Sequence, residues 1–167
     1  MKKLIVSAIT ILGFSAISFG QSAATATATA ILVKPLTIAV TSDMNFGTLA
    51  ATADLDGTVV LGLTNDLTPD GGARVIAGGA AKTAVFTISG EAGESISLDL
   101  PSAEITLSNG TQTLKVNTWT PNKGATAVLD ESGSLVLKVG ATIEIPKGTV
   151  AGTYKNDEAY KVTVDYN

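Results

Sequence analysis

Carboxylates are the side chains of this sequence with the most scope for chemistry, because the chain contains no histidine and no cysteine. Without these residue types it has no Ser-His-Asp or Cys-His nucleophile, no imidazole or thiolate ligand for zinc, and no ordinary general base near neutral pH. It also has no disulfide to staple the domain. Two kinds of chemistry remain open: cation binding by oxygen ligands, and acid–base catalysis by paired carboxylates.

Two Asp-containing stretches have the oxygen donors that calcium prefers. One holds Asp54 and Asp56, and the other holds Asp66 and Asp70. Neither has the spacing of an EF-hand loop, and Asp is common in turns because its carboxylate accepts local backbone hydrogen bonds. We therefore interpret both stretches as turns and predict no bound metal.

Two sequence-close carboxylate pairs, Glu91 with Glu94 and Asp157 with Glu158, have the residue types used in glycoside hydrolysis. A sugar-cleaving site also needs a cleft lined by aromatic side chains, and aromatic residues make up only 5% of this chain. With no catalytic motif elsewhere, we predict that the protein is not an enzyme and that it has no catalytic residue and no cofactor.

Trp119 is the single tryptophan, and two roles are open for it. It is either a platform for sugar stacking or partner binding, or a packing residue at a core or sheet edge. In a small β-domain the packing role is the better interpretation of a lone tryptophan.

The first twenty residues are typical of a secretory signal peptide. Lys2 and Lys3 precede an uncharged apolar stretch, residues 4–19. The small residues Ser18 and Gly20 then form a cleavage site before Gln21. The alternative is an N-terminal membrane anchor, but the apolar stretch is shorter than the ~20 residues that cross a bilayer. Cleavage near Ala24 is a further alternative. We predict a secreted protein of the cell surface or periplasm.

The charge balance excludes one class of partner. Without Lys2 and Lys3 the chain keeps nine basic and fifteen acidic residues, a net charge of −6. An acidic chain without a basic cluster is a poor binder of nucleic acid or anionic membranes. We expect no nucleic-acid partner and no stable transmembrane segment after signal cleavage.

The rest of the sequence alternates strands with turns and shows no helical period, which predicts an all-β fold, an antiparallel β-sandwich. All five prolines fall at or near the proposed segment boundaries. Residues 57–63 are apolar enough for burial on both faces, 65–72 have turn composition, and Gly140 separates two consecutive strands. The expected strands are 31–41, 45–50, 57–63, 84–89, 95–100, 104–107, 111–120, 134–139, 141–145 and 160–166.

Three segments make up the predicted domain organisation. They are the signal peptide (1–20), an Ala/Thr-rich arm (21–33) and a single β-sandwich domain (34–167). In the arm, Ala24, Ala26, Ala28 and Ala30 alternate with threonines, which is the period of an extended chain. The alternative for the arm is a disordered, low-complexity leader.

Four stretches of the chain resemble the DUF4402 family of secreted bacterial proteins. They are Pro35-Leu-Thr-Ile, Met44-Asn-Phe-Gly-Thr-Leu, Phe86-Thr-Ile-Ser-Gly-Glu-Ala-Gly, and Ala151-Gly-Thr-Tyr followed by Tyr160-Lys-Val-Thr-Val-Asp-Tyr. The ending is also similar to spore-coat-U-type and chaperone–usher pilin-like domains, although the chain lacks the usual pilin disulfide. The pilin resemblance implies an immunoglobulin-like sandwich on the cell surface that is able to polymerise.

Two functions follow as expectations. The first is a structural or adhesive, pilus-like subunit that binds copies of itself or other surface subunits by strand addition, with the arm as the added strand. The thin Ala face of the arm counts against this route, since a donor strand usually inserts larger apolar residues. The second is a monomeric extracellular module that binds carbohydrate or another surface polymer through its loops.

Overall fold

The computed structural model describes residues 22–77, 79–156 and 160–167, and the fold is all-β with antiparallel sheets, as predicted. The predicted signal peptide lies outside the described residues, and no helix among them is long and apolar enough to cross a membrane. The strands are β1 (Thr37–Ser42), β2 (Leu49–Ala51), β3 (Gly57–Leu61), β4 (Leu67–Gly71), β5 (Ala73–Val75), β6 (Ala84–Ser89), β7 (Ser95–Asp99), β8 (Ile105–Ser108), β9 (Thr113–Pro121), β10 (Thr126–Val128), β11 (Ser134–Ile145) and β12 (Thr163–Tyr166).

Leu32–Asn167 forms one compact unit, and residues 22–31 lie outside it, exposed and without strand structure. The prediction of a strand from residue 31 is wrong for 31–36, because β1 begins at Thr37. Pro35 has no backbone N–H to donate to a ladder, so the strand starts only after it. Ile31 and Leu32 are each 91% exposed.

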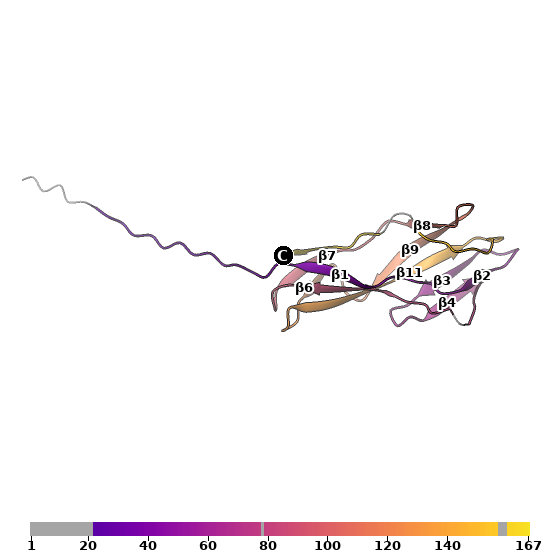
Figure 1. The fold of residues 1–167 in the computed structure, drawn as a ribbon, viewed down its shortest axis with the longest axis horizontal. Coiled ribbons are helices and arrows are strands. Elements are labelled where there is room, and N and C mark those ends of the chain that lie inside the picture. The colour runs from indigo at the N-terminus through magenta and orange to yellow at the C-terminus, as the bar shows by residue number, and fades with distance from the viewer. Residues whose placement is uncertain (1–21, 78, 157–159) are drawn as a thin grey trace, which may run out of the picture. The chain divides into compact units, whose positions relative to one another are not determined.

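The seven-stranded sheet is built around β11, which runs through most of the compact unit (Figure 1). Its first half, from Ser134 to Val139, pairs with β6, which in turn pairs with β1. Its second half pairs with β3 on one side and β9 on the other, and β4 and β8 form the next strands outward.

The predicted break at Gly140 is wrong, since β11 continues through it as one strand. The pairing with β9 shifts register between Gly140 and Thr142. A Cβ on Gly140 would lie 2.3 Å from the Leu61 carbonyl oxygen, so glycine permits a close strand approach here rather than a bend.

The first core lies between β1–β6–β11 and the three-stranded sheet β10–β7–β12. The strands predicted at 84–89 and 95–100 correspond to β6 and β7, and their alternating buried residues meet here. The buried members of this core are Ala84, Phe86, Ile88, Ile96, Leu98, Leu129, Leu135, Leu137, Val139 and Val162.

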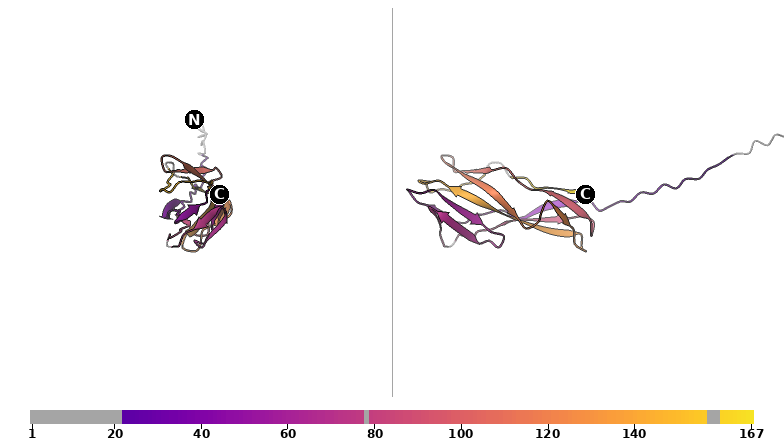
Figure 2. Two further views of the ribbon diagram at one scale, coloured as in Figure 1. Left: turned by 90° about the vertical axis from the view of Figure 1, so that its right-hand side faces the viewer. Right: turned by 180° about the vertical axis from the view of Figure 1, so that it is seen from behind.

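The second core lies toward the other end of the compact unit, among β3, β4, β8, β9, β2 and the second half of β11 (Figures 1 and 2). Met44 and Trp119 pack against both cores. The buried members of the second core are Phe46, Val59, Leu61, Ala73, Leu114, Val116, Ala141, Ile143 and Ile145.

Three further predictions about segments need correction. Residues 67–71 form β4 rather than a turn; Pro69 fits because β4 pairs only with β3, and Pro69 lies at a position whose N–H side faces outward. β3 is buried on one face only, since Val60 is 41% exposed. The last strand, predicted from residue 160, begins at Thr163, and the two short strands β5 and β10 were not predicted.

Candidate functional site

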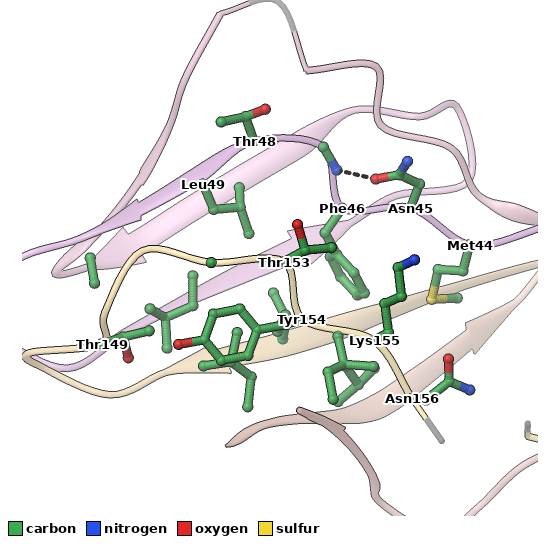
Figure 3. Close-up of a pocket in the computed structure, with 18 of the residues that line it drawn as sticks. Met44, Asn45, Phe46, Thr48, Leu49, Thr149, Thr153, Tyr154, Lys155 and Asn156 are labelled. Carbon is green, nitrogen blue, oxygen red and sulfur yellow. Dashed lines mark hydrogen bonds between the residues drawn. The ribbon is translucent and has the colours of Figure 1, made fainter. Parts of the chain in front are cut away.

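A groove of about 860 Å³ opens beside the second core (Figure 3). Two segments form its borders: Met44–Ala51, which ends in β2, and Thr149–Asn156, which follows β11. The two borders run in opposite directions across the gap. Its apolar lining is supplied mainly by β8, β9 and β11, through Ile105, Leu107, Leu114, Val116, Ile143 and Ile145.

The β2 border presents an unpaired strand edge to the groove. Hydrogen bonds from Ile76 N–H to the Thr48 carbonyl (2.9 Å) and from Thr52 N–H to the Gly72 carbonyl (3.0 Å) bracket the β2–β5 ladder. In an antiparallel pair, alternate residues direct their N–H and C=O groups toward the partner strand. The intervening residues, Leu49 and Ala51, therefore direct theirs away from β5, toward the groove.

The opposite border presents main-chain groups in the same way. Lys155 exchanges two hydrogen bonds with Ser108, at 2.7 and 3.0 Å, which adds this segment to the edge of β8. Tyr154, the preceding residue, therefore directs its N–H and C=O away from β8. Within the described segments, no backbone hydrogen bond joins Met44–Ala51 to Thr149–Tyr154. The strand order is thus interrupted at the groove.

Local hydrogen bonds hold the first border in place. The Asn45 Oδ1 atom accepts from Gly47 N–H (2.7 Å), and the Asn45 and Lys82 backbones exchange bonds of 2.8 and 2.7 Å. Gly47 has φ +69°, and a Cβ there would lie 3.1 Å from the Gly79 carbonyl oxygen. Glycine is therefore required both by the backbone conformation and by the close approach of the neighbouring loop.

The second border is held by Tyr154 and Gln112. The Tyr154 hydroxyl donates to the Val150 carbonyl (2.8 Å), and Val150 N–H donates to Gln112 Oε1 (2.8 Å). At one end of the groove, Gly148 N–H donates to the Thr52 carbonyl (3.1 Å) and joins the two borders. Both borders of the groove are therefore held in place by hydrogen bonds within the protein.

The charge of the groove restricts what it can bind. Among the described residues that line it, Lys155 is the only charged one. Phe46, Leu49 and Tyr154 extend between the borders in Figure 3 and add to the apolar lining. An uncharged, partly apolar segment fits most of this surface, because a charge placed away from Lys155 would be desolvated without a partner.

A second feature is the root of the N-terminal arm, Lys34, which lies beside the first core. Lys34 N–H donates to Glu91 Oε2 (3.0 Å), and the Tyr166 hydroxyl donates to the Lys34 carbonyl (2.7 Å). The same hydroxyl accepts from Glu91 N–H (2.7 Å). The arm therefore leaves the compact unit from a fixed point next to the last strand.

The four aspartates of the two predicted turns have different surroundings. Asp56 accepts from Lys147 N–H (2.7 Å), Asp54 is exposed, and Asp70 lies on β4 rather than in a turn. Asp66 accepts a hydrogen bond from the Thr64 hydroxyl, and that bond lowers the pKa of its carboxyl. Among the described residues, no group of three or more acidic side chains is placed to hold a metal ion.

The two members of the first carboxylate pair have different surroundings. Glu91 serves the arm root, and Glu94 is exposed beyond the turn that follows β6. The other pair, Asp157 and Glu158, lies outside the described residues.

Trp119 has the surroundings of a packing residue. Its indole N–H donates to the Ala103 carbonyl (2.9 Å), and its ring lies 5.1 Å from that of Tyr160 between ring centroids. Burial raises the pKa of Tyr160 to about 12, and the charge of Asp43 adds to this effect. The aromatic pair thus lies in apolar surroundings where the two cores meet.

Sequence reasoning did not find the groove, although the signal was present in two of the stretches that resemble DUF4402. Residues 44–49 and 151–154 lie on opposite borders of the groove. Their Asn, Gly and Thr residues indicate turns. Periodicity alone does not show that two segments distant in the sequence face one another across a gap.

Comparison with known proteins identifies the family. No curated protein and no solved structure matches the chain. The family model for DUF4402, a domain of unknown function, matches residues 36–166. This chain belongs to the DUF4402 family.

Proposed function

We propose that this protein is a non-enzymatic, secreted structural subunit of the cell surface, and that it assembles by accepting an extended strand in its groove. The observation that supports the proposal is the pair of unpaired main-chain edges, at Leu49 and Ala51 on one border and at Tyr154 on the other, above an apolar lining. In strand addition, main-chain hydrogen bonds supply the affinity and side-chain pockets the specificity.

A pilus-like or adhesive role fits this geometry. Unpaired strand edges are usually covered, charged or shortened, because they template pairing with another chain. Here the edge residues Leu49 and Ala51 are apolar and uncharged, and the cover is incomplete. In a subunit whose sheet is completed by a neighbour, such an edge is the place where the neighbour's strand pairs.

The alternative of a monomeric carbohydrate-binding module gains no support from Trp119. Its ring is half-buried in tilted contact with Tyr160, and its N–H is already bonded to the Ala103 carbonyl. These contacts support a packing role for this residue rather than a platform for sugar stacking. A natural chain that stays monomeric in the experiment below would favour this alternative.

The test is the size of the native protein recovered from the surface of the cells that make it, by gel filtration and negative-stain microscopy. We expect oligomers or filaments for the natural chain, and monomers for Leu107→Glu, which puts a charge into the groove. Thr106→Glu is the matched control: it adds the same charge one residue away, on the opposite face of β8, where Thr106 is exposed.

A monomeric natural chain, or Leu107→Glu assembling like Thr106→Glu, would overturn the proposal. Circular dichroism and urea unfolding show whether Leu107→Glu is folded. If it is not, Ala51→Pro replaces it, because this substitution removes a main-chain donor on the groove side and leaves the β2–β5 bonds in place.

A further inference from the structure

The occupant of the groove must meet three requirements. It must be extended over about eight residues, the number in each border, Met44–Ala51 and Thr149–Asn156. Eight residues of strand span roughly 26 Å. It must carry free main-chain groups on both edges, one of which pairs antiparallel and the other parallel, since the borders run in opposite directions. It must also be uncharged on the side that faces the lining.

We infer that the occupant is the N-terminal arm of a second copy of this chain, with the alanine face of residues 24–32 against the lining. This inference rests on the proposed function, since it names the strand that the groove accepts. Residues 22–33 form no strand of their own, and the sequence has no charged residue between Ser22 and Val33.

The alternation of the arm gives it one apolar and one hydroxyl-bearing face. Ala24, Ala26, Ala28 and Ala30 share a face with Leu32, and the threonines lie on the other together with Ile31. With the alanine face inward, the threonine hydroxyls stay in water and need no buried partner. Alanine side chains are small, so the inserted backbone can lie close to the apolar lining, which already carries bulky side chains.

The length of the arm favours a neighbour over its own domain. The root at Lys34 is fixed beside the first core, and the groove lies beside the second. β11, whose twelve residues span roughly 40 Å, contributes to both cores. The twelve residues 22–33 span the same distance when extended. In their own chain they would be needed to reach the groove, and none would be left to fill it.

The resulting contact is heterologous, because the arm and the groove are different surfaces at different ends of the compact unit. Contacts of this kind join head to tail and give filaments unless the rotation closes a ring. The proposal therefore predicts chains of subunits rather than a symmetric dimer.

The test uses two full-length variants with complementary defects. Ala28→Lys damages the arm and keeps the groove, and Leu107→Glu damages the groove and keeps the arm. Each alone is expected to be monomeric by light scattering coupled to gel filtration. An equimolar mixture is expected to form dimers and nothing larger, because only one productive arm–groove pair is possible. Thr27→Lys, with its lysine on the outer face, is the control and is expected to assemble like the natural chain.

Two outcomes would overturn the inference while leaving the proposed function intact. One is that Ala28→Lys assembles normally while Leu107→Glu does not. The other is that the mixture stays monomeric although the natural chain assembles. In both cases the groove would be needed for assembly but filled by a different strand. If Leu107→Glu itself assembles, the proposed function fails together with the inference.

Discussion

The two cores of the compact unit share one strand, β11, but differ in what borders their strand edges. At the first core, β6 has a partner on each edge, β1 and β11, and a second sheet covers its inner face. At the second core, β2 has a partner on one edge only, and its other edge faces the groove.

Side-chain burial does not reveal this difference. Leu137 in the first core and Val116 in the second are both fully buried. Open strand edges occur in both regions, since β1, β10 and β12 at the first core also pair on one edge only. What distinguishes the second region is that the open edge of β2 borders a groove with an apolar lining. Apolar burial therefore accounts for folding in both regions, whereas only the second has the groove in which we propose that a strand binds.

The largest expected effect compares the same substitution in the two regions. Leu137→Ala leaves a cavity in the closed first core and is expected to lower the free energy of unfolding by about 3 kcal/mol. Leu107→Ala is expected to cost about 1 kcal/mol or less, because Leu107 is partly exposed beside the groove and leaves no closed cavity. Urea unfolding of both variants measures the difference, and equal losses would contradict the distinction between a closed and an open core.

A pH experiment examines the junction of the two cores at Tyr160. Its pKa is about 12 in the folded protein, against about 10 when unfolded. Between these values the unfolded chain loses a proton that the folded protein keeps, so stability falls as pH rises from 10 to 12. A difference of two corresponds to about 2.7 kcal/mol. We expect roughly half of that, because solvent near Tyr160 screens the effect.

Tyr160→Phe is the control for this pH effect. Lysines titrate in the same range, so the quantity to compare is the loss of stability of the natural chain minus that of the variant. Parallel curves for the two proteins would show that Tyr160 is as well solvated in the folded protein as in the unfolded one.

Strands with clear alternation were predicted well from the sequence. Residues 84–89 and 95–99 alternate apolar and polar positions, and both form strands whose inward residues build the first core. β8 and β9 form a hairpin through Asn109-Gly110, a pair of residues typical of hairpin turns, and Gly110 has a positive φ of 89°. In these regions the local pattern and the tertiary environment agree.

Segments whose structure depends on distant partners were not predicted. β4 contains Pro69, Asp70 and Gly71, which have low strand propensity, and it forms because β3 offers a complete antiparallel partner. β11 continues through Gly140, where the absence of a side chain leaves room for the Leu61 carbonyl oxygen. The groove depends on the absence of pairing between segments about a hundred residues apart, which no local pattern records.

The smallest expected effect applies one substitution, tyrosine to phenylalanine, at the two places where a hydroxyl holds a segment in position. Tyr166→Phe removes the bonds to Lys34 and Glu91 at the arm root, and Tyr154→Phe removes the bond to Val150 at the groove border. Each is expected to cost about 1 kcal/mol. Amide hydrogen exchange should speed up at Glu91 in the first variant and at Val150 in the second, with the other site unchanged. Faster exchange at both sites in either variant would mean that the two ends open together, and the assignment of the arm and the groove to independently held regions would then be wrong.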